Sequence, residues 1–139
     1  APFYRCYPCA DGKEISVGAI EPQFYAELCE RARAPERLRH GQMNPANWDS
    51  YAEDLAALFA TRTQAEWCAL LEGSDACFAP VVPMDAAREH PHMKARETYV
   101  EMDGRWHTAP APRFGRTPGR VRPSAEDGAA VIERWRGAA

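Results

Sequence analysis

Two runs near the start of the chain are rich in β-prone apolar residues, and apolar residues in the run after them recur at helical spacing. Residues 3–7 and 14–20 are β-prone and lie on either side of an Asp-Gly turn, which predicts a hairpin. From Pro22 to Ala32, apolar residues recur at helical spacing after a proline that suits the first helical position. Glu21 therefore lies where a strand passes into a helix.

Two further helices are predicted in the middle of the chain. Apolar residues recur at helical spacing from Trp48 to Phe59. Thr63 and Glu66 then form the pattern of a capping box, in which side chains satisfy the open N–H groups of a helix start. A short apolar run over residues 77–82 indicates a strand after this third helix.

A second hairpin follows a short helix that we predict near Asp85. Residues 98–102 and 105–108 flank another Asp-Gly pair, as a tight hairpin requires. The pattern as a whole predicts an α+β fold, in which a small domain over residues 1–108 contains antiparallel hairpins and three to four helices.

Residues 109–139 have a different character. Prolines interleaved with arginines exclude a helix over most of the segment and leave few apolar anchors. A last helix is predicted after Ser124, with Asp127 in a capping pattern and Trp135 on the apolar face. We expect an extended C-terminal arm and helix that pack on another domain; a short linker folding back onto its own domain explains the composition equally well.

Composition excludes several classes of function. The chain has 139 residues, 45% hydrophobic and 27% charged, with a formal net charge of −3 and no basic stripe for nucleic acid. No apolar run approaches the ~20 residues that a bilayer crossing needs, and residues 1–10 lack the pattern of a signal peptide. We expect a cytoplasmic protein without nucleic-acid or membrane partners.

The cysteines indicate free thiols rather than a disulfide framework. There are five, an odd number, in a chain with enough apolar residues to fold without disulfides. Cys6 and Cys9 form a C-x-x-C pair that could be half a zinc site or a redox pair, but residues three apart on a strand point to opposite faces and no second pair exists. We therefore expect structural thiols, no metal and no cofactor.

Two other candidate sites are weak. His90 and His92 flank a proline and could offer imidazoles to a metal, yet no carboxylate at suitable spacing completes a site, so we expect a surface turn. No Gly-x-Ser-x-Gly and no glycine-rich loop after a strand is present, which argues against hydrolase and nucleotide-binding functions.

Glu21 has the most informative position among the candidate catalytic residues. A carboxylate just before a helix faces the positive end of the helix dipole and free N–H groups, so it tends to stay ionised and well held. Spacing alone favours the simpler interpretation, a helix-start charge that contributes under ~1 kcal/mol.

The run Gly18-Ala19-Ile20-Glu21-Pro22-Gln23-Phe24-Tyr25 resembles the alpha-methylacyl-CoA racemases of the family III CoA-transferase superfamily. The likeness covers nearly the whole chain and continues through residues 1–4, 10–12, 74–77, 79–81, 90–92 and 109–114. The segment from Ala34 to Asn47 departs from the family pattern, which leaves its conformation open.

This resemblance implies a two-domain protomer, with a large Rossmann-like domain that holds CoA and a small α+β domain reached through long linkers. A His and an Asp of the large domain would remove and return the α-proton of an acyl-CoA thioester through an enolate. This chain matches the small domain and the returning tail. In these racemases a glutamate of the small domain completes the active site, and it maps onto Glu21. The resemblance therefore implies a catalytic role for Glu21 in place of a simple helix-start charge.

The resemblance also implies an interlocked homodimer, in which the small domain of one protomer covers the large domain of the other. We therefore expect a C-terminal fragment of a racemase that acts on 2-methylacyl-CoA, inactive without its large domain. The alternatives are the small domain of a family III CoA-transferase, which would use a covalent acyl anhydride, and a free-standing interaction module.

We predict that limited proteolysis cuts the chain first between Pro112 and Ser124, because a proline-broken, arginine-rich arm has little buried backbone to protect it. Mass spectrometry of the first tryptic fragments identifies the cut. Earlier cleavage within the segment from Ala34 to Asn47, with an intact arm, would show that the arm is docked.

Overall fold

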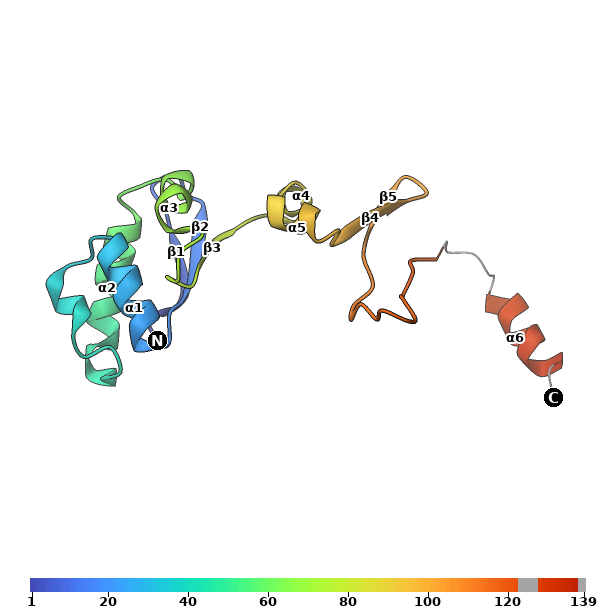
Figure 1. Cartoon of the computed structure of the whole chain (residues 1–139), viewed down its shortest axis with the longest axis horizontal. Coiled ribbons are helices and arrows are strands. Elements are labelled where there is room, and N and C mark those ends of the chain that lie inside the picture. Colours follow the sequence, from blue (N-terminus) through green and yellow to red (C-terminus); the bar gives the residue numbers. More distant parts are fainter. Residues whose placement is uncertain (123–127, 138–139) are drawn as a thin grey trace. The chain divides into compact units, whose positions relative to one another are not determined.

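The computed structural model describes residues 1–122 and 128–137, and the chain divides into two units, Ala1–Val82 and Pro83–Ala139. The first unit begins with the predicted hairpin, in which β1 (Tyr4–Pro8) pairs antiparallel with β2 (Glu14–Gly18). Strand β3 (Phe78–Val81) pairs antiparallel with the other edge of β2, which makes β2 the central strand (Figure 1).

Three helices follow where the apolar spacing predicts them: α1 (Pro22–Arg31), α2 (Trp48–Phe59) and α3 (Gln64–Leu71). Two short 3₁₀ helices, η1 (Glu36–Arg39) and η2 (Pro45–Asn47), lie in the segment whose conformation the sequence left open. Helix α2 contacts β1, and α3 contacts β3. The helices and the inner side of the sheet thus enclose one core.

Aromatic side chains form the centre of this core. Phe59 lies between Tyr7 and Trp67, with ring centroids 5.2 and 5.1 Å away. The polar atoms of these rings are paired, because the Tyr7 hydroxyl donates to the Pro2 carbonyl at 2.6 Å and the Trp67 Nε1 donates to the Phe59 carbonyl at 2.9 Å. Burial raises the pKa of Tyr7 to about 12, against the opposing effect of Arg5.

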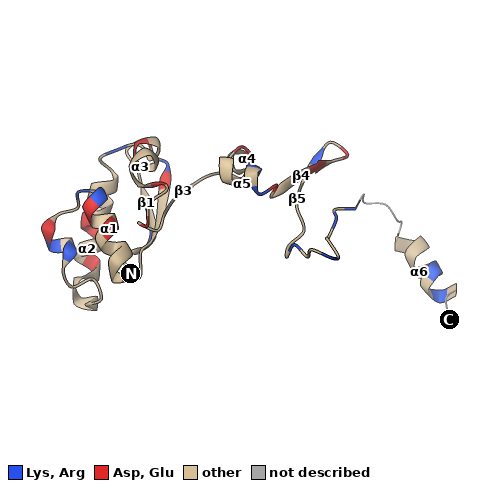
Figure 2. Ribbon diagram, viewed as in Figure 1, with Lys and Arg blue, Asp and Glu red and all other residues tan. Residues whose placement is uncertain are grey.

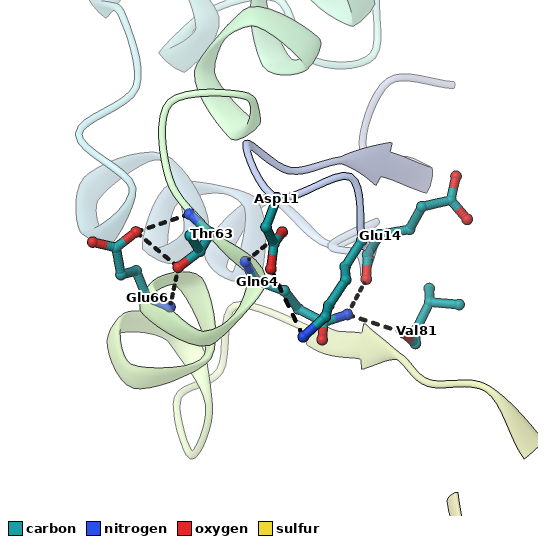
Figure 3. Close-up of polar contacts among 7 residues, drawn as sticks. Asp11, Glu14, Thr63, Gln64, Glu66 and Val81 are labelled. Atoms are coloured by element: carbon teal, nitrogen blue, oxygen red, sulfur yellow. Dashed lines mark hydrogen bonds and ion pairs between the residues drawn. The ribbon is translucent and has the colours of Figure 1, made fainter. Parts of the chain in front are cut away.

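A buried glutamine links α3 to the sheet (Figure 3). Gln64 is 9% exposed, and its Nε2 donates to the carbonyl of Glu14 at 2.6 Å and to that of Val81 at 2.9 Å. Just before it, Thr63 and Glu66 form the predicted capping box. The N–H and hydroxyl groups of Thr63 hold the pKa of Glu66 below its ordinary value.

The second unit contains short elements: α4 (Met84–Ala87), α5 (Pro91–Ala95), the antiparallel hairpin of β4 (Tyr99–Met102) and β5 (Arg105–Thr108), and α6 (Gly128–Gly137). The turn of the hairpin is formed by Asp103 and Gly104, which both have positive φ, at 53° and 70°. That conformation explains the Asp-Gly pair at this position, because it matches the twist of the strands.

The prediction of a surface turn at His90 and His92 is wrong. His90 is the N-cap of α5, and its ring nitrogen accepts a hydrogen bond from the backbone N–H of His92 at 3.3 Å. The intervening proline occupies the first helical position, where its missing N–H has no cost.

The described part of the arm, residues 109–122, contains no helix or strand. In Figure 2 its only charged residues are basic, whereas both signs occur on the hairpin before it. Arg113 connects the arm to the residues that follow α5. Its guanidinium donates hydrogen bonds to the carbonyls of Arg96 and Glu97, the latter at 2.9 Å.

The α+β fold class is confirmed by these antiparallel hairpins and short helices. The boundary between the two units lies between Val82 and Pro83. The domain boundary at residue 108 and the packing of residues 109–139 on another domain stay predictions. The predicted cap at Ser124 and Asp127 lies outside the described residues. Among the described helices, none has the length and apolar character that crossing a bilayer requires.

Candidate functional site

The candidate site is the turn that joins β2 to α1, here called the Glu21 turn and defined as Gly18–Pro22. The sequence predicted a strand as far as Ile20, but β2 ends at Gly18. The Ile20 N–H donates to the Gly18 carbonyl at 2.9 Å, within the chain, while the Gly18 N–H donates to the Cys77 carbonyl at 2.8 Å. The chain therefore leaves the sheet at Gly18 and folds back sharply before the helix begins.

Glu21 is the N-cap residue of α1, with φ −70° and ψ 140°. Its carbonyl accepts the first helical bond, from Tyr25 N–H at 3.0 Å, but its carboxylate caps no N–H group. The side chain is exposed, and the structure gives it no hydrogen bond or ion pair within residues 1–122 and 128–137. The fold fixes the backbone of Glu21 and leaves its carboxylate available.

A side chain from the segment of open conformation holds this turn. Gln42 is 8% exposed, and its Nε2 lies 3.0 Å from the Ala19 carbonyl oxygen and 2.9 Å from that of Ile20. The Gln42 carbonyl accepts a hydrogen bond from Trp48 Nε1 at 2.9 Å. Gln42 is not predictable from the sequence, because a single glutamine in a polar stretch gives no periodic signal.

Cys77 lies beside the same turn, because its backbone carbonyl accepts a hydrogen bond from the Gly18 N–H at 2.8 Å. Cys77 has a positive φ of 49° and is exposed. Desolvation raises the pKa of its thiol, and the carboxylates of Glu21 and Asp75 raise it further. A change in the charge of Glu21 is therefore expected to shift the pKa of the Cys77 thiol.

The outer face of the sheet carries a shallow groove next to the turn. Its volume is about 430 Å³, and its walls include Tyr4, Cys6, Ser16, Gly18 and Cys77. These residues are exposed or half-buried. The groove thus reaches the Glu21 turn at Gly18, next to Cys77.

Cys6 and Cys9 do not form a site together. Cys6 is exposed and Cys9 is buried, as expected for two residues three apart in extended backbone. All five cysteines are free thiols. Across the described ranges, no three His, Cys, Asp or Glu side chains are grouped so that they could hold a metal ion.

The second unit has a larger cavity of its own, about 770 Å³, between α5, the β4–β5 hairpin and the arm. Its walls include the guanidinium of Arg88, which lies 5.1 Å from the centroid of the Trp106 ring. No candidate residue from the sequence analysis lies in this cavity.

Comparison with known proteins decides the family. The sequence model described as CoA-transferase family III matches residues 1–127. The chain belongs to CoA-transferase family III. The resemblance drawn from the Glu21 run is therefore confirmed, since curated racemases match over the same region.

Two curated relatives of this family are named alpha-methylacyl-CoA racemase. The mouse protein is 41% identical over 120 residues, which are 85% of this chain and 31% of the mouse chain. The human protein is 37% identical over 119 residues, again 85% of this chain and 31% of the relative. The chain thus spans about a third of the length of the curated relatives it matches.

A solved structure with a similar fold also matches the chain. The crystal structure of Rv3272 from Mycobacterium tuberculosis superposes with a TM-score of 0.67 at 17% identity, and the match covers 83% of this chain and 33% of that one. At this level of identity, the likeness shows the fold.

Glu21→Gln is expected to lower the pKa of the Cys77 thiol, because it removes one of the two carboxylates that raise this pKa. The measurement is the pH dependence of alkylation in a Cys6→Ser background, which removes the other exposed thiol. Glu30→Gln, on the same helix, is the matched control and should leave the profile unchanged. An unaltered Cys77 profile in Glu21→Gln would contradict the described geometry.

Proposed function

We propose that this chain is the small C-terminal part of an acyl-CoA racemase, which inverts the α-methyl stereocentre of 2-methylacyl-CoA thioesters. The observation that carries the proposal is Glu21, an exposed carboxylate on a fixed backbone that the fold itself does not use. It lies in the run that resembles the racemases, and two curated relatives over 85% of the chain carry that name.

The proposed reaction requires no redox partner or cofactor. The thioester carbonyl acidifies the α-carbon, so a base can remove its proton and the electron pair moves to the carbonyl oxygen as an enolate. A second group returns a proton to the opposite face, which restores the thioester with the inverted centre. The resemblance assigns these two proton transfers to a His and an Asp of the large domain.

The role that we propose for Glu21 is to support that histidine. A carboxylate within hydrogen-bond reach of an imidazole orients the ring and favours the imidazolium that forms when the proton is taken. The exposed position of Glu21 at the start of α1 leaves its carboxylate free to meet a partner domain.

The remaining parts of the proposal concern assembly. Residues 109–139 would pack on the large domain, since α6 exposes Ile132 (48%) and Trp135 (71%). An interlocked homodimer would bring the small domain of one protomer over the large domain of the other. The cytoplasm is the proposed location, and the isolated chain is expected to be inactive.

A CoA-transferase is the second candidate. A relative from Fusarium pseudograminearum named acyl-CoA transferase is 30% identical over 93 residues, covering 63% of this chain and 20% of the relative. The two candidates differ in what they need, because a transferase requires an acceptor carboxylate whereas a racemase turns over a single thioester. The alternative of a free-standing interaction module would require neither.

In the full-length enzyme, Glu21→Gln should lower kcat about 10- to 1,000-fold, on the scale of general acid–base catalysis. The substitution keeps the shape and removes the charge, so the thermal midpoint should change little, given that a helix-start charge contributes under ~1 kcal/mol. The assay is deuterium exchange at the α-carbon of 2-methylacyl-CoA.

Glu30→Gln on the same helix is the control and should retain full exchange. If Glu21→Gln exchanges at the normal rate but melts several degrees lower, then Glu21 is only a helix-start residue and its proposed catalytic role is wrong.

A further inference from the structure

The backbone of the Glu21 turn presents two carbonyl groups to a single buried amide. The carbonyl oxygens of Ala19 and Ile20 both lie within 3.0 Å of Gln42 Nε2. Two acceptors at this distance require a donor with two hydrogens, which identifies the amide nitrogen and excludes the amide oxygen at that position. Gln42 therefore satisfies both carbonyls that precede Glu21.

The location of this amide is itself fixed. Gly41 has a positive φ of 69°, and a Cβ there would lie 2.7 Å from Asn47 Nδ2, so the loop requires glycine next to Gln42. On the other side, the Gln42 carbonyl accepts from Trp48 Nε1 at 2.9 Å. Gln42 is thus held by its own backbone and can act as a rigid support.

Aromatic contacts connect this support back to the helix that follows Glu21. The Trp48 ring meets the Phe3 ring edge to face at 5.9 Å, and Phe3 meets Tyr25 of α1 at 6.0 Å. The path from Gln42 through Trp48, Phe3 and Tyr25 ends in the first turn of α1. Both sides of Glu21 are therefore anchored to the same loop.

We propose that Gln42 is a positioning residue for Glu21, acting through the carbonyls of Ala19 and Ile20. The inference rests on the proposed function of Glu21 and adds a residue to it. Without the Gln42 donors, both carbonyls would have to turn toward water, and the Glu21 backbone would move with them. A displacement of about 1 Å in a catalytic group can lower the rate about 100-fold.

A matched control lies at the other end of the sheet. Gln64 is equally buried, at 9% against 8% for Gln42, and its Nε2 also donates to two backbone carbonyls (Figure 3). Those carbonyls belong to Glu14 and Val81, outside the Glu21 turn. Gln64→Met and Gln42→Met thus each remove two side-chain donors to backbone carbonyls from equally buried positions.

In the full-length enzyme, Gln42→Met should lower kcat for α-proton exchange by about 10-fold or more, with KM changed less than about 3-fold. Gln64→Met and Gln42→Met should lower the thermal midpoint by similar amounts, but Gln64→Met should leave kcat unchanged. In the Glu21→Gln background, Gln42→Met should cause little further loss, because both substitutions act on one group.

Three results would overturn the proposal: equal kcat for Gln42→Met and Gln64→Met, a full additional loss in the double variant, or a change confined to KM. If Gln42→Met does not fold, Trp48→Phe is the replacement variant, because it removes the hydrogen bond to the Gln42 carbonyl and keeps an aromatic ring. An unchanged kcat in Trp48→Phe would contradict the proposal. A normal rate in Glu21→Gln defeats the proposed role of Glu21 as well. A loss in Glu21→Gln without one in Gln42→Met defeats only the role of Gln42.

Discussion

The conformation of the candidate site depends on one requirement, that the carbonyl groups of Ala19 and Ile20 be hydrogen-bonded where the chain leaves the sheet. Strand β2 stops at Gly18, so no neighbouring strand can supply donors for these groups. Gln42 supplies them from a loop more than twenty residues further along the chain. This single amide connects the loop, the sheet and the start of α1, and it leaves the Glu21 carboxylate uncommitted.

The fold was predictable wherever the signal is local. The Asp-Gly turns, the capping box of Thr63 and Glu66, and the helical repeats all involve residues within a few positions of one another. Glu21 at the strand–helix junction belongs to the same class. The start of α5 also has a local signal, since His90 is an N-cap and a proline follows at the first helical position. The prediction of a surface turn at this position was nevertheless wrong.

The support of the site was not predictable in this way. Gln42 acts on carbonyls that are 22 and 23 residues distant in sequence, and a polar stretch with scattered prolines and a glycine gives no period from which to infer such a contact. The division between Val82 and Pro83 is likewise a property of packing. The local sequence pattern thus identified Glu21 as a candidate, whereas the contact that supports its backbone, from Gln42, depends on long-range packing.

A crystal structure of the full-length enzyme with an acyl-CoA thioester tests the central claim most directly, because it locates Glu21 relative to the proton-transfer groups. The account predicts that the Glu21 carboxylate lies within hydrogen-bond reach of the large domain's histidine, directly or through one water. Glu21 turned toward bulk solvent, with the histidine supported by another group, would contradict it.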